Sequence, residues 1–96
     1  MPRYEIIVED IASSDETAGY STVLAVQAVI DKKVLRDEEQ YAEVFIHELI
    51  ESINQASLCY TIKHDDLSIV AKELSHILLA TGWKPPVIPP EGFKID

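Results

Sequence analysis

The chain has 96 residues, of which 47% are hydrophobic and 26% charged, a balance typical of one small folded domain rather than of a disordered segment. The formal net charge is −9, from 17 acidic and 8 basic residues, which disfavours binding to nucleic acid and to anionic membranes. No stretch approaches the ~20 apolar residues of a membrane span, and MPRYEIIVED at the start lacks a signal-peptide core, so we expect a cytoplasmic protein.

The first third of the chain is predicted to be mainly β. RYEIIVEDI, from Arg3, is rich in Tyr, Ile and Val and indicates a strand, and the small polar residues of 12–19 indicate a loop. Residues 20–35 favour one or two strands with a turn near Asp31. A short helix over residues 23–30 is the alternative, because a continuous apolar run does not distinguish a strand from a helix.

A long helix is predicted to begin after Asp37, a good N-cap residue followed by acidic residues in the first turn. Residues 37–58 contain no Gly or Pro over 22 positions. At helical period the apolar residues share one wide face, which we expect to contact the core. This face consists of Ala42, Phe45, Ile46, Leu49, Ile50, Ile53 and Ala56.

The other face of this helix carries a polar stripe at spacings of 4, 4 and 3 residues, formed by Glu43, His47, Glu51 and Asn54. The segment FIHELIESIN (45–54), which contains three of these residues, is similar to the zinc-binding helix motif His-Glu-x-x-His, with Glu51 in place of the second His. Imidazole and carboxylate are both zinc ligands, so His47 and Glu51 could hold one metal from adjacent turns. Glu48 points about 100° away around the helix, as the general base of the full motif does.

A second helix is predicted from about residue 64, where His64, Asp65 or Asp66 could serve as the cap, to a stop at Gly82. The preceding link contains the only cysteine, Cys59, which fits a reducing compartment and is expected to be a small buried residue. Residues 83–96 are Pro-rich and predict an extended tail after a domain of residues 1–82, with Trp83 folded back onto that domain. The apolar stripe expected to pack the second helix is Leu67, Val70, Ala71, Leu74, Ile77 and Leu78.

A catalytic zinc site needs a third protein ligand, and three residues of the second helix are candidates. His64 is ranked first because a link that doubles back could bring it to the metal. Simple antiparallel pairing would instead place Glu73, ranked second, and His76, ranked third, level with His47. The alternative interpretation is an ordinary acidic helix in which His47 and Glu51 are only solvated.

FIHELIESINQASLCYTIKHDDLSIVAKELSHIL resembles the small zincin-like metallopeptidases of phages and prophages over roughly residues 30–79. In that family a strand, matched here by Ile30-Asp31, precedes the motif helix, and a His opens the next, Leu-rich helix. The matching positions are His47, Glu48, Glu51, Asn54 and His64. The resemblance implies that His47, Glu51 and His64 bind zinc or another divalent metal and that Glu48 is the catalytic base.

These observations together predict an α+β domain with a small N-terminal antiparallel sheet covered by two amphipathic antiparallel helices. The predicted function is a phage-derived zincin-like metal-dependent hydrolase, a peptidase with a degenerate site, acting on a peptide substrate in the bacterial host cytoplasm. The alternative is a non-catalytic acidic phage protein that binds a host or phage protein.

Overall fold

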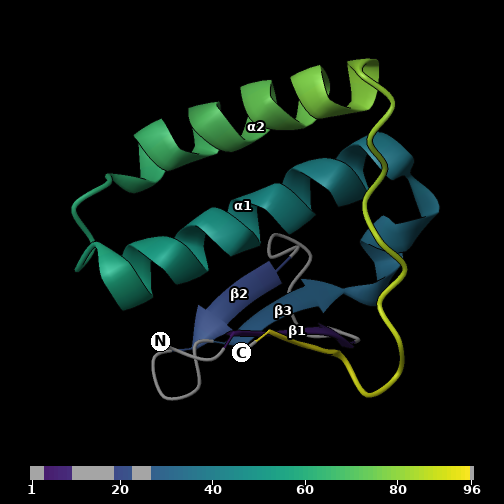
Figure 1. Cartoon of the computed structure of the whole chain (residues 1–96), viewed down its shortest axis with the longest axis horizontal. Helices are drawn as coiled ribbons and strands as arrows, with labels where there is room; N and C mark the ends of the chain where they lie inside the picture. Colours follow the sequence, from purple (N-terminus) through teal and green to yellow (C-terminus); the bar gives the residue numbers. More distant parts are fainter. Residues whose placement is uncertain (1–3, 10–18, 23–26, 96) are drawn as a thin grey trace.

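In the computed structural model the chain is described at residues 4–9, 19–22 and 27–95. The elements form three layers, in which the long helix α1 (Glu38–Ser57) lies between a sheet and the second helix, α2 (His64–Ala80), as Figure 1 shows. The mixed class with two helices is therefore confirmed. The expectation that both helices cover the sheet is wrong, because α1 packs on the sheet and α2 packs on α1.

The sheet has the strand order β2-β3-β1-β4, with β1 at Tyr4–Glu9, β2 at Gly19–Thr22, β3 at Gln27–Asp31 and β4 at Phe93–Ile95. β1 and β3 pair in parallel, with Ile7 opposite Val29, whereas β2 on β3 and β4 on β1 are antiparallel. The expected wholly antiparallel sheet is therefore wrong. Each of the central strands β1 and β3 contains a short continuous apolar run, at residues 6–8 and 28–30, and such runs carry no signal of strand direction.

Residues 20–35 were predicted to form one or two strands, and among the described residues 20–22 belong to β2 and 27–31 to β3. The competing helix over residues 23–30 is excluded at 27–30, which belong to β3, while Arg3, 10–18 and 23–26 lie outside the described residues. The turn expected near Asp31 is the short 3-10 helix η1 (Lys32–Arg36). Asp31 is buried and caps it, since its Oδ1 accepts a hydrogen bond from the Lys33 N–H at 3.1 Å.

α1 begins as predicted, because the Asp37 carboxylate accepts hydrogen bonds from the N–H groups of Glu39 and Gln40 at 3.0 and 3.2 Å. Its buried arc is wider than its apolar stripe and is displaced from it. Ile53, expected in the core, is exposed, whereas Glu48 and Ser52 are buried. The reason is that α1 packs against the sheet on one side and against α2 on another, so polar residues of α1 are buried as well. The buried residues of α1 are Tyr41, Ala42, Phe45, Ile46, Glu48, Ser52 and Asn54.

α2 buries only a narrow arc, because within the described part of the chain it packs mainly on α1. Its fully buried residues are Leu67, Ala71 and Ser75, and the small side chains of the last two allow the helices to approach closely. Half of the stripe expected in the core, namely Val70, Leu74 and Ile77, is exposed. None of the three expected caps is used, because the N-cap is Lys63 and has no side-chain bond.

The C-terminal segment crosses the end of the helix pair where α1 begins and returns to the sheet (Figure 1). Gly82 ends α2 with φ +96°, and the Trp83 N–H then donates to the Leu78 carbonyl at 3.0 Å. Trp83 packs on the core with its ring centroid 6.3 Å from that of Phe45, which confirms its predicted return. The Tyr41 hydroxyl donates to the Pro86 carbonyl, and β4 closes the sheet edge. Among the described helices, none is long and apolar enough to span a membrane.

Candidate metal centre

Three side chains converge at the linked end of the two helices. His47 and Glu51 come from successive turns of α1, and His64 is the first residue of α2. One donor atom from each lies within 4.8 Å of the others. The Glu51 Oε1 atom is 3.8 Å from His47 Nε2 and 3.2 Å from His64 Nδ1. The imidazole centroids are 5.2 Å apart, at an interplanar angle of 69°.

These separations fit one metal ion in a tetrahedral site. Bonds of ~2.0–2.2 Å from zinc to nitrogen and oxygen place two tetrahedral donor atoms about 3.4 Å apart and two bound imidazole centres about 5 Å apart. Two histidines and one glutamate are also the donor set of a class of catalytic zinc sites, in which water takes the fourth position. The residues present therefore fit zinc in both donor type and spacing.

The site is half-buried on α1 and open on the α2 side. The exposed fractions of the side chains are 21% for His47, 29% for Glu51 and 67% for His64. Burial lowers the pKa of His47, as does the neighbouring His64, and the carboxylates of Glu51 and Glu43 act in the opposite direction. The net lowering favours neutral imidazole, which is the form that binds a metal.

The sequence-based alternatives for the third ligand are not brought to this group. Glu73 and His76 are both exposed and lie outside it. His76 lines a pocket together with Glu39, eight residues before His47 in α1, which corresponds to about 12 Å along the helix. The antiparallel register assumed from the sequence is therefore shifted, and among these three candidates only His64 meets His47 and Glu51.

Glu48, expected as the catalytic base, follows His47 directly but is only 4% exposed. It is not a member of the three-residue group. Its backbone carbonyl accepts a hydrogen bond from the buried hydroxyl of Ser52 at 2.9 Å. Its role as a base remains a prediction.

The link between the helices has an unusual backbone. Cys59 and Tyr60 have φ values of +50° and +61°, in the left-handed region that non-glycine residues seldom adopt. Cys59 is exposed, so its expected burial is wrong.

Asn54, assigned to the polar stripe from the sequence, is 5% exposed and is bonded through its side chain to the backbone of Ile62. Helical spacing predicts which residues share a face of one helix, so it could not predict this contact with Ile62, which lies in the link.

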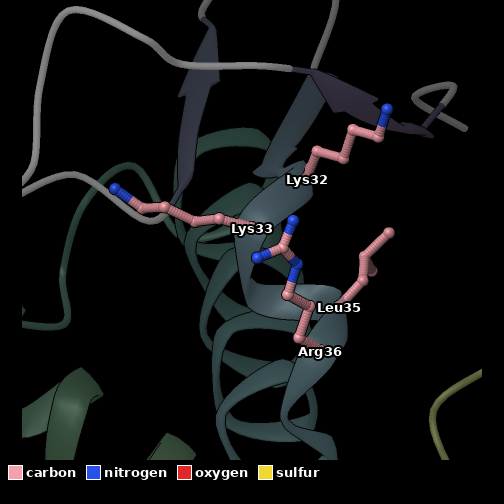
Figure 2. Close-up of a pocket in the computed structure, with 4 residues that line it drawn as sticks. All are labelled: Lys32, Lys33, Leu35 and Arg36. Carbon is pink, nitrogen blue, oxygen red and sulfur yellow. The ribbon is translucent and has the colours of Figure 1, made fainter.

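A second cluster of charged side chains surrounds η1, where Lys32, Lys33, Leu35 and Arg36 line a pocket (Figure 2). Figure 2 shows the Lys32 and Lys33 chains extending to opposite sides, with the Arg36 guanidinium between them. Lys33 is also engaged by Asp31, with Nζ 3.4 Å from Oδ2. The three cations do not converge on one point, so we assign no ligand to this pocket.

The chain was compared with protein families, with curated proteins and with solved structures. None of them matches it.

Proposed function

We propose that this protein binds a divalent metal, zinc in the first instance, through His47, Glu51 and His64, and that it is a zincin-like hydrolase acting on peptides in a bacterial cytoplasm. The observation that carries the proposal is the convergence of these three donors, in which His64 Nδ1 lies 3.2 Å and His47 Nε2 3.8 Å from Glu51 Oε1. The resemblance to phage zincin-like metallopeptidases supports the same ligand set.

The proposal assigns two roles to residues of this chain, metal binding and proton transfer. His47, Glu51 and His64 hold the metal, which when bound supplies Lewis-acid polarisation and a water of lowered pKa. Glu48 takes the proton of the attacking water. Because Glu48 is buried, this second task is the more demanding test of the hydrolase proposal.

Metal binding is tested by purifying the protein without chelator and measuring its metal content by elemental analysis. We expect close to one metal per chain, lost in His47→Ala and in His64→Ala. His76→Ala is the matched control, because His76 is exposed and lies outside the group. A well-folded wild type that neither contains a metal nor takes up added zinc would refute the proposal.

The hydrolase part needs a separate experiment, with a mixture of quenched fluorescent peptides as substrate. Glu48→Gln should abolish cleavage and retain the metal, whereas Glu39→Gln, on the exposed first turn of α1, should change neither. Full activity of Glu48→Gln would remove Glu48 from the mechanism. Metal binding without cleavage by the wild type would leave a metal-binding protein and contradict the hydrolase.

A second candidate function, binding of a protein partner, is favoured by the exposed apolar face of α2. Val70, Leu74 and Ile77 follow one another at helical spacing and are 51%, 38% and 59% exposed. The exposed acids Asp66 and Glu73 precede the first and last of them by one turn. An acidic edge beside an apolar stripe fits an amphipathic helix with basic residues from another protein.

This binding is tested with a synthetic Leu- and Lys-rich amphipathic peptide and its scrambled counterpart. We expect the ordered peptide alone to bind, and Leu74→Asp to abolish the binding. Ile69→Asp is the control, since Ile69 is equally apolar and exposed but lies about 100° from Val70 around the helix. Equal loss in both variants, or self-association of the wild type through this face, would contradict the proposed partner.

A further inference from the structure

We propose that Asn54 is the positioning residue that brings His64 to the metal centre, by fixing the link between the helices to the end of α1. This inference rests on the proposed metal-binding function. It concerns a residue that supplies no ligand atom and acts through the backbone two residues before His64.

Three hydrogen bonds connect Asn54 to the link. Its side-chain Nδ2 donates to the Ile62 carbonyl at 3.0 Å, and its Oδ1 accepts from the Ile62 N–H at 3.1 Å. Its backbone carbonyl accepts from the Tyr60 N–H at 2.9 Å. Both polar groups of the Asn54 side chain are therefore used on one residue, which fixes the direction of the chain there as well as its distance from α1.

The link needs such support because its backbone is unfavourable on its own. Cys59 and Tyr60 are consecutive non-glycine residues in the left-handed region, a conformation that persists only where surrounding contacts determine it. The side chains of Leu58, Cys59, Tyr60 and Thr61 are exposed, so packing contributes little. The turn is held by the hydrogen bonds to Asn54 and by the bond from the Thr61 N–H to the Leu58 carbonyl at 3.0 Å, of which only those to Asn54 tie it to α1.

The position of His64 depends directly on that turn. α2 begins at His64 with Lys63 as a cap that makes no side-chain bond, so no capping side chain fixes the backbone at the start of the helix. His64 is also largely exposed. Its side chain contacts the ring of His47 and the carboxylate of Glu51, the two other proposed ligands. Ile62 is thus the nearest fixed point before His64 in the chain.

Removing the side chain of Asn54 should weaken metal binding without changing a ligand. Loss of a residue that orients a metal ligand typically lowers affinity about 10- to 100-fold, and we expect a loss of this size in Asn54→Ala. Asn54→Asp, which can still accept from the Ile62 N–H but cannot donate to its carbonyl, should fall between Asn54→Ala and the wild type. It also serves if Asn54→Ala does not fold.

The experiment is a double-mutant cycle, with zinc affinity measured by competition with a chromophoric chelator. The His64→Ala variant, although it should lose its metal on purification, keeps His47 and Glu51 and should still bind added zinc weakly. In that background Asn54→Ala should cause no further loss of affinity, because the residue through which it acts is gone. Ser52→Ala is the matched control: it removes a buried hydroxyl from the same helix that bonds within α1, and should leave zinc affinity unchanged. Equal losses in both backgrounds, or an Asn54→Ala variant that binds zinc as tightly as the wild type, would overturn the inference.

A metal-free measurement separates this inference from the proposed function. In the chelated wild type, NMR cross-relaxation between the His47 and His64 rings should report their 5.2 Å separation, and Asn54→Ala should lose it. Loss of the ring contact in a protein that binds no zinc would refute the metal site and leave the positioning role intact. Retention of the contact in both Asn54 variants would refute the positioning role whether or not zinc binds.

Discussion

At the end of the helix pair where α1 begins and α2 finishes, the contacts are aromatic and apolar, whereas at the linked end they are polar. Tyr41, Phe45 and Trp83 stack edge-on or tilted at the first end, with ring centroids 6.0 and 6.3 Å apart. At the other end Asn54 holds the link and His64 meets Glu51. Burial of apolar surface contributes most of the free energy of folding, whereas the polar contacts fix the orientation of the link and of His64. We therefore expect substitutions at the two ends to separate stability from metal binding.

The largest effect is expected at the apolar end, from Phe45→Ala. Phe45 is buried between Tyr41 and Trp83, and removing a buried aromatic ring costs about 3–5 kcal/mol. That is a large share of the stability of a domain of this size. Urea denaturation measures it. A loss below about 1 kcal/mol would show that this end does not hold the fold, and the comparison would fail.

The next effect belongs to the polar end, where zinc should stabilise the folded chain. At a free concentration 100 times the dissociation constant, a ligand specific for the folded state adds about 2.7 kcal/mol to the free energy of unfolding. Thermal unfolding with and without zinc should show this increment in the wild type and lose it in Glu51→Gln. Glu73→Gln, an exposed acid outside the group, should keep it. Equal increments in both variants would show that zinc acts elsewhere.

Local sequence rules predicted most of the helix boundaries. The predictions that failed concern burial and strand pairing, which depend on residues distant in the sequence. Asp37 and Gly82 act within a few residues of themselves, so the start of α1 and the end of α2 were predictable. The exposure of Val70 depends on how many elements surround α2, which its own periodicity does not encode. The parallel pairing of β1 with β3 is likewise a property of the whole sheet.

The candidate site was predictable in the part that lies on one helix. His47 and Glu51 are one turn apart, and helical geometry alone brings them together. The arrival of His64 depends on a left-handed turn at Cys59 and Tyr60, and neither residue type signals such a turn as Gly or Asn would. His64 was ranked first only because a link that doubles back could bring it to the metal, whereas simple antiparallel geometry favoured Glu73 and His76.

A smaller effect is expected at Tyr60, the second left-handed residue of the link. Glycine adopts this conformation without the steric penalty of about 1–2 kcal/mol, but loses more chain entropy on folding, so Tyr60→Gly should stabilise by about 0.5–1 kcal/mol. The exposed tyrosine ring contributes little packing. Thr61→Gly is the control and should destabilise, because Thr61 is not among the residues with positive φ. Destabilisation by both variants would mean that the turn is not strained.

The smallest effect is the pH dependence of the metal-free protein, because the causes acting on His47 partly cancel. Burial lowers its pKa below the unfolded value of about 6.5, so the unfolded chain binds more protons in the interval between the two values. Stability should therefore be constant above that interval and decline as the pH falls through it. The decline should be absent in His47→Gln and retained in His76→Gln, measured by urea denaturation in chelator between about pH 7.5 and 5.5. If His47→Gln kept the full decline, the polar end would not bury His47 enough to favour its neutral, metal-binding form.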